Sequence, residues 1–420
     1  MKLFYLTLLT LILSYACEKL PDSFLTVVEL DKNEIIIRVN EESTLSIDSY
    51  YPEKPDSLQI EWFSTDTNRV IVDNGIVIGV APGQAMVYVK VNGIQSQSCN
   101  ITIIGVYDAD NDVYILGNQG KKLMCWKNGI PTQVTEAKFR IIGKAIHALD
   151  ENIYVAGDDY TSEGYPVAKC WINGKEIVLS EKHSQVRDIA VSQNDVYVVG
   201  CEVKENGVTT ATLWKNGIVN YLDENALFSI ANAITITNGD IYVVGYSNVY
   251  ENKTNYEVAK YWKNGEEIEI TRSNTAYAHD IYIKDNKVYA LVNGSLNNKY
   301  LAKYWVDDKE FILSERSSPT FARSMTISGN DLYVSGVVYD ESINHSYATL
   351  WVNGVEKWIS TNSLYGEICE IASSNGDVYV LANENHPNFY GPKYWKNGKE
   401  IFFEHYHNIS FASDIFIVQK

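Results

Sequence analysis

Positive charge is scarce in this sequence, which has 35 Lys and Arg residues against 53 Asp and Glu residues and a formal charge of −18. A protein that binds DNA or RNA needs a basic face for the phosphate backbone, so this composition argues against a nucleic-acid partner. Leu and Ala are sparse beyond the N-terminus, whereas 30 Tyr and 9 Trp residues are present. Because aromatic side chains pack well on a pleated sheet, we expect an all-β protein.

Cysteine and histidine form no pattern typical of a metal site or a disulfide framework. Six cysteines are present, and assigning Cys17 to the leader described below leaves an odd number, so at least one is unpaired. No CxxC pair or Cys/His spacing indicates zinc. No Gly-x-Ser-x-Gly, P-loop or dinucleotide motif occurs. We therefore predict no metal, no cofactor and no catalytic residue, and we expect a protein that is not an enzyme.

The apolar run at the N-terminus, residues 3–13, is too short to span a bilayer, which needs about 20 residues. It follows Lys2 and precedes Ser14-Tyr15-Ala16, so we assign residues 1–16 to a targeting segment. The pattern resembles a bacterial lipoprotein signal, although Ser14 stands where that family prefers leucine. The resemblance implies a lipid on Cys17, an anchor in the outer membrane and a tether over residues 17–27. An ordinary secretory signal, with a periplasmic or secreted protein, is the alternative.

Two acidic residues after Cys17 bear on which side of the outer membrane the protein faces. Glu18 and Asp22 follow the cysteine closely. They resemble the acidic tag that sends Bacteroidota lipoproteins to the cell surface, so we expect a surface location.

Residues 28–105 contain about seven short apolar runs separated by turn residues, the pattern of a small β-sandwich. Pro52 ahead of Trp62, Gly75-Ile76-Val77-Ile78-Gly79 and Pro82-Gly83-Gln84-Ala85 resemble the bacterial Ig-like group 2 family. The resemblance implies a spacer domain in which Trp62 is a core residue.

From residue 106 to 420 the chain repeats one unit seven times: a strand that reads Asp-x-Tyr, a variable stretch, and a strand that ends in Trp-x-Asn-Gly. The repeat tryptophans are Trp126, Trp171, Trp214, Trp262, Trp305, Trp351 and Trp395. A period of 43–48 residues with four strands per unit predicts the blades of a β-propeller. Asn-Gly predicts a tight hairpin between the third and fourth strands of six units, and the fifth unit carries Asp307-Asp308 at this place. We interpret the tryptophans as core residues, not as sugar platforms.

The two ends of the repeat region complement each other. The first unit begins at its second strand, at Asp112, whereas residues 411–417 match the first strand of the other units. We therefore predict a seven-bladed propeller that the C-terminal strand closes, because closure removes exposed sheet edges. The Trp-Asp, Gly-His and Gly-Gly signatures of WD40 and kelch repeats are missing. The blades look like those of uncharacterised secreted Bacteroidota proteins that carry an Ig-like domain first.

The stretch between the second and third strands varies from 12 to 20 residues between the Tyr and the Trp. Variable loops on a rigid scaffold concentrate binding residues, and in a propeller these loops share one face with the mouth of the central channel. Tyrosine supplies rigid, amphipathic contact area there. Ordinary solvated loops are the alternative. The candidate tyrosines are Tyr160, Tyr165, Tyr246, Tyr250, Tyr256, Tyr300, Tyr339, Tyr347 and Tyr390.

The beginning of each unit's first strand forms a second candidate site, at the channel mouth. One aligned position carries Lys144, Arg187, Asn232, His279, Arg323, Cys369 and Ser413. The next position carries Ala145, Asp188, Ala233, Asp280, Ser324, Glu370 and Asp414. Within these rings we predict ligand contacts from Arg187, Asp188, His279, Asp280 and Arg323. Polar strands around a water-filled channel are the alternative.

These features predict a non-enzymatic surface protein whose propeller presents a binding face to a glycan or to another protein, with the Ig-like domain as spacer. A structural subunit of a surface complex is one alternative. The other is a propeller enzyme that acts on a polysaccharide, which would require two carboxylates about 5–10 Å apart near the channel mouth.

Overall fold

The computed structural model describes residues 25–420 except 40, 105–107, 109, 252, 297–298, 314–318, 341–344, 359–364, 387–388 and 402–410. The regular structure of this part is β-strand. Across the same residues, no helix is long and apolar enough to cross a membrane. The chain divides into two compact units, Met1–Val106 and Tyr107–Lys420.

The first unit is a small all-β body around one hydrophobic core. Its sheets have the orders β1-β4, β2-β10-β8-β5 with β9 beside β8, and β3-β7-β6. Val77, Val87 and Ile101 come from different strands and are fully buried in the same core, and Trp62 packs against it. The strands are β1 (Val27–Leu30), β2 (Glu34–Arg38), β3 (Glu42–Thr44), β4 (Ile47–Tyr51), β5 (Ile60–Ser64), β6 (Val70–Asp73), β7 (Ile76–Gly79), β8 (Gly83–Val91), β9 (Ile94–Gln95) and β10 (Cys99–Ile104).

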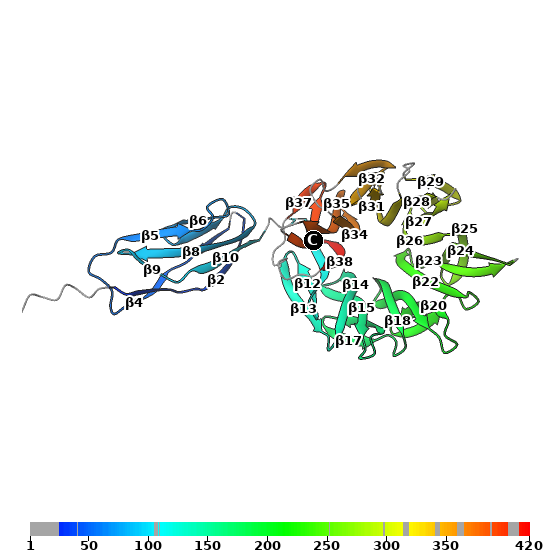
Figure 1. Ribbon diagram of the computed structural model, residues 1–420, viewed down its shortest axis with the longest axis horizontal. Helices are drawn as coiled ribbons and strands as arrows, with labels where there is room; N and C mark the ends of the chain where they lie inside the picture. Colours follow the sequence, from blue (N-terminus) through cyan, green and yellow to red (C-terminus); the bar gives the residue numbers. More distant parts are fainter. Residues whose placement is uncertain are drawn as a thin grey trace, which may run out of the picture. The chain divides into compact units, whose positions relative to one another are not determined.

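The second unit is a propeller of seven four-stranded antiparallel sheets, which Figure 1 shows arranged around a ring. Each sheet is one blade, and its strands run in order from the middle of the ring outwards. Blade 1 consists of β38 (Phe411–Gln419), β11 (Asn111–Gln119), β12 (Lys122–Lys127) and β13 (Ile130–Glu136). Blade 2 consists of β14 (Arg140–Leu149), β15 (Asn152–Tyr160), β16 (Pro166–Ile172) and β17 (Lys175–Val178). Blade 3 consists of β18 (Ser184–Ser192), β19 (Asp195–Val203), β20 (Thr209–Lys215) and β21 (Ile218–Tyr221).

Blades 4 to 7 repeat this order. Blade 4 consists of β22 (Phe228–Thr237), β23 (Asp240–Glu251), β24 (Thr254–Lys263) and β25 (Glu266–Ser273). Blade 5 consists of β26 (Ala276–Lys284), β27 (Lys287–Leu296), β28 (Lys299–Val306) and β29 (Lys309–Ile312). Blade 6 consists of β30 (Thr320–Ser328), β31 (Asp331–Asp340), β32 (His345–Val352) and β33 (Val355–Trp358). Blade 7 consists of β34 (Tyr365–Ser374), β35 (Asp377–His386), β36 (Phe389–Lys396) and β37 (Lys399–Ile401). The predicted all-β class and seven-bladed propeller are confirmed.

The repeated Asp and Asn-Gly positions are bonded to each other within a blade. In blade 1, Asn128 accepts a hydrogen bond from the Val113 N–H at 2.9 Å and donates one to Asp112 at 2.7 Å. Equivalent pairs occur in blades 2, 3, 4, 6 and 7. Asn128 and Gly129 have φ angles of 51° and 79°, as a type I′ turn requires. The motif therefore fixes the outer hairpin to the second strand and needs no ligand to explain it.

The repeat tryptophans are buried between neighbouring blades. Trp214 of blade 3 shares a core cluster with Tyr154 and Cys170 of blade 2. All seven are at most 6% exposed. Burial raises the pKa of the Cys125 and Cys170 thiols to about 12, so both behave as small apolar side chains. The tryptophans are core residues, as interpreted from the sequence.

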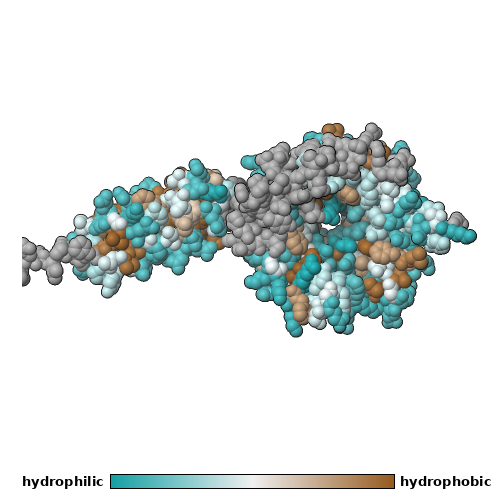
Figure 2. Space-filling model, in the orientation of Figure 1, coloured by the Kyte–Doolittle hydropathy of each residue, from teal (hydrophilic) through white to brown (hydrophobic). Residues whose placement is uncertain are grey.

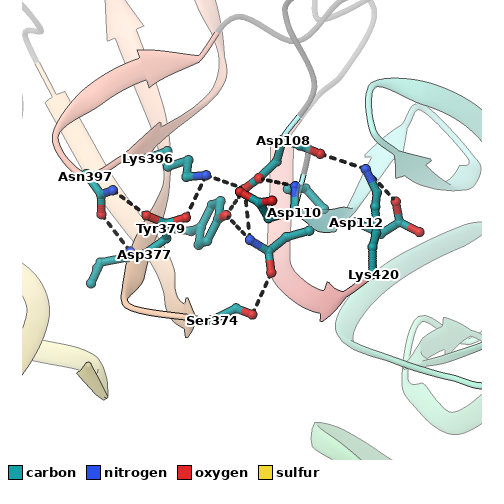
Figure 3. Close-up of polar contacts among 12 residues, drawn as sticks. Asp108, Asp110, Asp112, Ser374, Asp377, Tyr379, Lys396, Asn397 and Lys420 are labelled. Atoms are coloured by element: carbon teal, nitrogen blue, oxygen red, sulfur yellow. Dashed lines mark hydrogen bonds and ion pairs between the residues drawn. The ribbon is translucent and has the colours of Figure 1, made fainter. Parts of the chain in front are cut away.

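The C-terminal strand closes the ring as predicted, because β38 pairs with β11 in blade 1. Asp108, which precedes β11, bonds this blade to blade 7 (Figure 3). The Asp108 carboxylate accepts hydrogen bonds from the Tyr379 hydroxyl and, at 2.7 Å, from Lys396 Nζ. Lys420 Nζ donates to the Asp108 carbonyl oxygen at 2.7 Å. Burial alone would raise the pKa of Asp108, but the bonds from Lys396 and Tyr379 outweigh it and lower the pKa to about 2.

Candidate functional site

The propeller encloses a central channel with a cavity of about 1110 Å³. Its lining comes mainly from the innermost strands β14, β18, β22, β26, β30, β34 and β38. The space-filling view shows an opening at the middle of the ring (Figure 2). The second and third strands meet at the same end of each blade where the innermost strand begins, so this end forms one mouth of the channel.

Every innermost strand carries a β-bulge at the same place, near this mouth. In blade 3, Val186 pairs with Gly200 and Asp188 with Val199, which leaves Arg187 as the extra residue. A bulge redirects the side chain of the extra residue. The seven extra residues are Lys144, Arg187, Asn232, His279, Arg323, Cys369 and Ser413. All of them except Cys369, whose side chain lies outside the described residues, line the cavity.

The predicted second ring ties neighbouring blades together. The Asp188 carboxylate accepts hydrogen bonds from the Ile189 N–H of its own strand and, at 2.8 Å, from the Ile234 N–H of blade 4. Asp280 bonds blade 6 through the Met325 N–H at 2.6 Å, and Asp414 bonds blade 2 through the Ile146 N–H at 2.7 Å. These carboxylates line the cavity, but their oxygens are occupied by backbone N–H groups. Their contacts are those of structural ties between blades.

One pair in this ring shares a hydroxyl group. Ser324 Oγ lies 3.1 Å from the Asp280 carboxylate and also contacts the Glu370 carboxylate. A hydroxyl has one proton to donate, so Ser324 donates to one of the two carboxyls at a time. Burial raises the pKa of Glu370 well above its usual value, and the charges of Asp414 and Asp280 raise it further. Burial and the neighbouring charges therefore both favour the protonated form of Glu370.

The buried carboxyls predict that stability falls as pH rises from 6.5 to 8. Burial raises the pKa of Asp188 to about 7 and also raises that of Asp414. A carboxyl whose folded pKa is raised contributes stability that is complete below its unfolded pKa, near 4, and that is lost progressively as pH rises from there to the folded pKa. The free energy of unfolding, measured with urea, should fall by about 1–2 kcal/mol across this window. Burial lowers the pKa of His147 and His279 to about 4, so neither titrates there.

A matched pair of variants tests the source of this slope. Glu370→Gln removes one titrating group and should reduce the slope, whereas Glu176→Gln, on an exposed carboxylate paired with Lys169, should leave it unchanged. A wild-type stability that is constant or rises between pH 6.5 and 8 would contradict the assignment.

The bulge residues bring positive charge to the mouth. Lys144 pairs with the buried Asp158 at 3.6 Å. Arg187 donates to Gln185 at 3.3 Å, its Nε is buried with no hydrogen-bond partner, and no carboxylate of the described residues lies within ion-pair distance. His279 lies between the arginines in the order of the bulges. Burial lowers its pKa to about 4, with contributions from the charges of Arg323 and Arg187. The imidazole is therefore neutral beside two guanidinium groups.

Aromatic side chains line the same mouth over blades 4 to 6. Tyr246 meets Tyr277 edge to face at 4.6 Å between ring centroids. Tyr300 and Phe321 are 4.6 Å apart, and Phe321 is 40% exposed. All four line the cavity. We call Arg187, His279, Arg323, Tyr246, Tyr277, Tyr300 and Phe321 the mouth site.

The structure brings some predicted residues together and not others. Arg187, Asp188, His279, Asp280, Arg323, Tyr246 and Tyr300 all line the cavity. The other described tyrosines do not: Tyr160 lies under the Arg140 guanidinium, Tyr165 lies near His183, and Tyr250 is 59% exposed on β23. Tyr256, Tyr339 and Tyr347 are also outside the lining. The side chain of Tyr390 lies outside the described part of the chain. Cys17 lies outside it altogether.

Most of the candidate tyrosines lie on strands, which corrects the loop prediction. In blade 4 the hairpin between the second and third strands stays paired as far as Glu251 and Thr254, so Tyr246, Tyr250 and Tyr256 belong to β23 and β24. Tyr246 and Tyr250 are four residues apart and share a face of β23, but the pairing of β23 with the innermost strand β22 ends at Asn248, so Tyr250 lies beyond it and is exposed.

Tyr277 and Phe321 were missed by the sequence analysis. Each stands two residues before a bulge residue, His279 and Arg323, and therefore on the same face of its strand. The spacing of two residues between the aromatic side chain and the bulge residue can be read in the sequence. Only the position of the bulge, however, shows that this face of the strand lines the channel.

Within the part of the chain described above, no three His, Cys, Asp or Glu side chains are placed to hold a metal ion.

Comparisons with known proteins add little to this geometry. No family model matches the chain, and no curated protein is significantly similar to it. Among solved structures, it is similar to a puromycin-hydrolyzing peptidase of Mycobacterium tuberculosis, with 9% identity and a TM-score of 0.47 over 70% of this chain and 52% of that one. It is also similar to the β-propeller domain of the Trilobed protease from Pyrococcus furiosus, with 12% identity and a TM-score of 0.42 over 72% and 98%. A thermostable family-43 glycoside hydrolase has 11% identity and a TM-score of 0.35 over 53% and 93%. No activity is carried over from such distant similarity.

Proposed function

We propose that this protein is a non-enzymatic binding protein that takes a glycan chain at the mouth site. The observation that supports this most is the combination of four aromatic side chains with arginines and a neutral histidine around one cavity. Binding sites pair apolar walls with a few placed polar groups. A sugar ring has an apolar C–H face and a polar edge of hydroxyl groups, which matches amphipathic tyrosine.

The cellular setting belongs to the same proposal. A lipid on Cys17 anchors the chain in the outer membrane, facing the cell surface, and residues 28–105 act as an Ig-like spacer. A periplasmic or secreted location is the alternative. A protein partner in place of the glycan is the alternative for the ligand.

A second candidate function, hydrolysis of a polysaccharide, is favoured by one observation. Asp280 and Glu370 contact the same Ser324 hydroxyl, so two carboxyls lie close together on the cavity wall, and burial raises the pKa of Glu370 well above its usual value. Glycosidases use such a pair, one as acid and one as base or nucleophile. Against this function, the Asp280 oxygens accept hydrogen bonds from the Ile281 and Met325 N–H groups.

Alanine variants of the mouth tyrosines test the binding proposal. The purified protein is screened on a glycan array, and the affinity of each hit is measured by calorimetry. Tyr246→Ala and Tyr300→Ala should each weaken binding by about tenfold or more, since aromatic anchors dominate binding energy. Tyr250→Ala, on the same strand as Tyr246 but exposed and outside the cavity, is the matched control and should bind as the wild type does.

Hydrolysis of each hit is then followed by chromatography of the products. Turnover that Glu370→Gln abolishes would replace the binding proposal with the enzyme. Binding that Tyr250→Ala weakens and Tyr246→Ala does not would move the site away from the channel mouth.

A further inference from the structure

We propose that the glycan bound at the mouth site contains acetamido sugars, whose amide N–H donates a hydrogen bond to Tyr277 Oη. This inference rests on the proposed function and specifies its ligand class. An acetamido group joins an N–H donor to an apolar methyl group. The mouth site offers a matching acceptor, Tyr277, and an apolar surface, Phe321, and both line the cavity.

The hydroxyl proton of Tyr277 is already held by a carboxylate. Tyr277 Oη, on β26, donates to Glu257 Oε1, on β24 of blade 4, at 2.6 Å. The other Glu257 oxygen accepts the Ala276 N–H at 3.3 Å, so the carboxylate is bonded twice to the strand that carries Tyr277. Burial and the hydrogen bond to Glu257 raise the pKa of Tyr277, so the phenol keeps its proton. A phenol oxygen that donates its proton still has lone pairs, and Tyr277 therefore selects a ligand group that donates.

The apolar surface lies on the neighbouring blade. Tyr277 and Phe321 are equivalent residues of blades 5 and 6, because each stands two residues before its bulge residue. Phe321 is 40% exposed, and its ring centroid lies 4.6 Å from that of Tyr300. Tyr246 of blade 4 meets the Tyr277 ring edge to face. A methyl group held against these rings is removed from water, which favours its binding.

Charges of both signs at the mouth favour an uncharged group. Burial and the charge of Glu257 raise the pKa of Tyr300 to about 12. Burial lowers the pKa of His279 to about 4, and the charges of Arg323 and Arg187 contribute. Glu257 would therefore oppose an anionic ligand group, and the guanidinium groups would oppose a cationic one, whereas an acetamido group has no net charge. The neutral His279 ring has one N–H, which can donate to the acetamido carbonyl oxygen.

Three trisaccharides with one backbone and one linkage test the inference by calorimetry. They consist of N-acetylglucosamine, glucosamine or glucose, and so they differ only in the acetamido, amino or hydroxyl group at carbon 2. We expect the acetamido form to bind about tenfold more tightly than each of the others, because neither of them offers both a donor and a methyl group. Every hit of the array screen should contain an acetamido sugar.

Tyr277→Phe keeps the aromatic ring and removes the acceptor. It should lower the preference for the acetamido form over the glucose form from about tenfold to about threefold or less. Tyr221→Phe is the matched control, since Tyr221 Oη donates to Glu202 Oε1 at the same 2.6 Å and neither residue lines the cavity. Both variants lose one Tyr–Glu hydrogen bond, so a general loss of stability would appear in both. Only the change at the mouth should alter binding.

Equal binding of the acetamido and glucose forms, or array hits without acetamido sugars, would overturn the acetamido assignment and leave the glycan proposal standing. Tightest binding of the glucosamine form would overturn it in favour of an amine. A preference for the acetamido form that Tyr277→Phe leaves unchanged would also overturn it, because Tyr277 would then not be the acceptor. No binding of any glycan, on the array or among the three trisaccharides, would overturn both this inference and the proposed function.

Discussion

Removal of residues 411–420 is expected to abolish cooperative unfolding of the propeller. These residues form β38, the innermost strand of blade 1, which pairs with β11 at eight positions from Asn111↔Gln419 to Asn118↔Phe411. Without it, blade 1 has three strands and β11 presents an open edge to the channel. Ala412 and Ile415, both buried, also leave the core shared with blade 7.

The same deletion removes bonds on both sides of blade 1. Asn383 of blade 7 donates to the Ala412 carbonyl oxygen and accepts from the Ala412 N–H, both at 2.9 Å. Asp414 holds the Ile146 N–H of blade 2. A ring that loses one inner strand therefore loses contacts to two further blades, which is why the expected effect exceeds that of a point change.

Calorimetry and limited proteolysis measure this loss. The truncated protein should show no sharp propeller transition and should be cleaved throughout residues 107–410. A synthetic peptide of residues 411–420, added in excess, should restore part of the transition, because the strand is held by non-covalent pairing. Ile415→Ala is a milder comparison that should cost about 2–4 kcal/mol and keep the fold. An unchanged transition after truncation would mean that the ring closes in another way.

Gly200→Ala is expected to give the largest destabilisation of any single methyl addition in blade 3. A Cβ at Gly200 would lie 1.9 Å from the carbonyl oxygen of Gln185, a backbone atom next to the bulge at Arg187. No rotation of a side chain relieves such a clash, so either the bulge or the β18–β19 pairing must shift. Costs of overpacking are about 1–3 kcal/mol, and we expect the upper end or more.

Gly265→Ala separates this clash from the ordinary cost of replacing glycine. Gly265 has a φ of +87°, but an added Cβ meets no atom within 4 Å. Its cost should be about 1 kcal/mol, which reflects the backbone conformation alone. Urea unfolding of both variants compares the two losses in the free energy of unfolding. Equal costs would show that the backbone at Gly200 yields easily, and the bulge would then not be a rigid holder of Arg187.

The sequence alone was informative wherever the interacting residues belong to one repeat unit. Asp112 and Asn128 are 16 residues apart, and their bond forms within one blade, so the repeated motif could be identified as a hairpin and counted. Closure by residues 411–417 was equally predictable, since that segment matches the innermost strand that the first unit lacks.

The candidate site was predictable only in part. Aligning the units placed Arg187, His279 and Arg323 at one position, and the structure brings them to one cavity. The tyrosines were chosen as loop residues, and this failed for Tyr160 and Tyr250, which lie on strands outside the cavity. Side-chain direction depends on hairpin register, and register is set by pairing with the neighbouring strand.

By itself, then, the sequence determined the fold class, the number of blades and the strand that closes the ring, because these follow from local hairpins repeated along the chain. The tertiary structure alone decided which side chains meet across the channel. Arg187 and Arg323 stand on blades 3 and 6, with two blades between them in sequence, and only the closed ring and its bulges place them around one mouth with Tyr246, Tyr300 and Phe321.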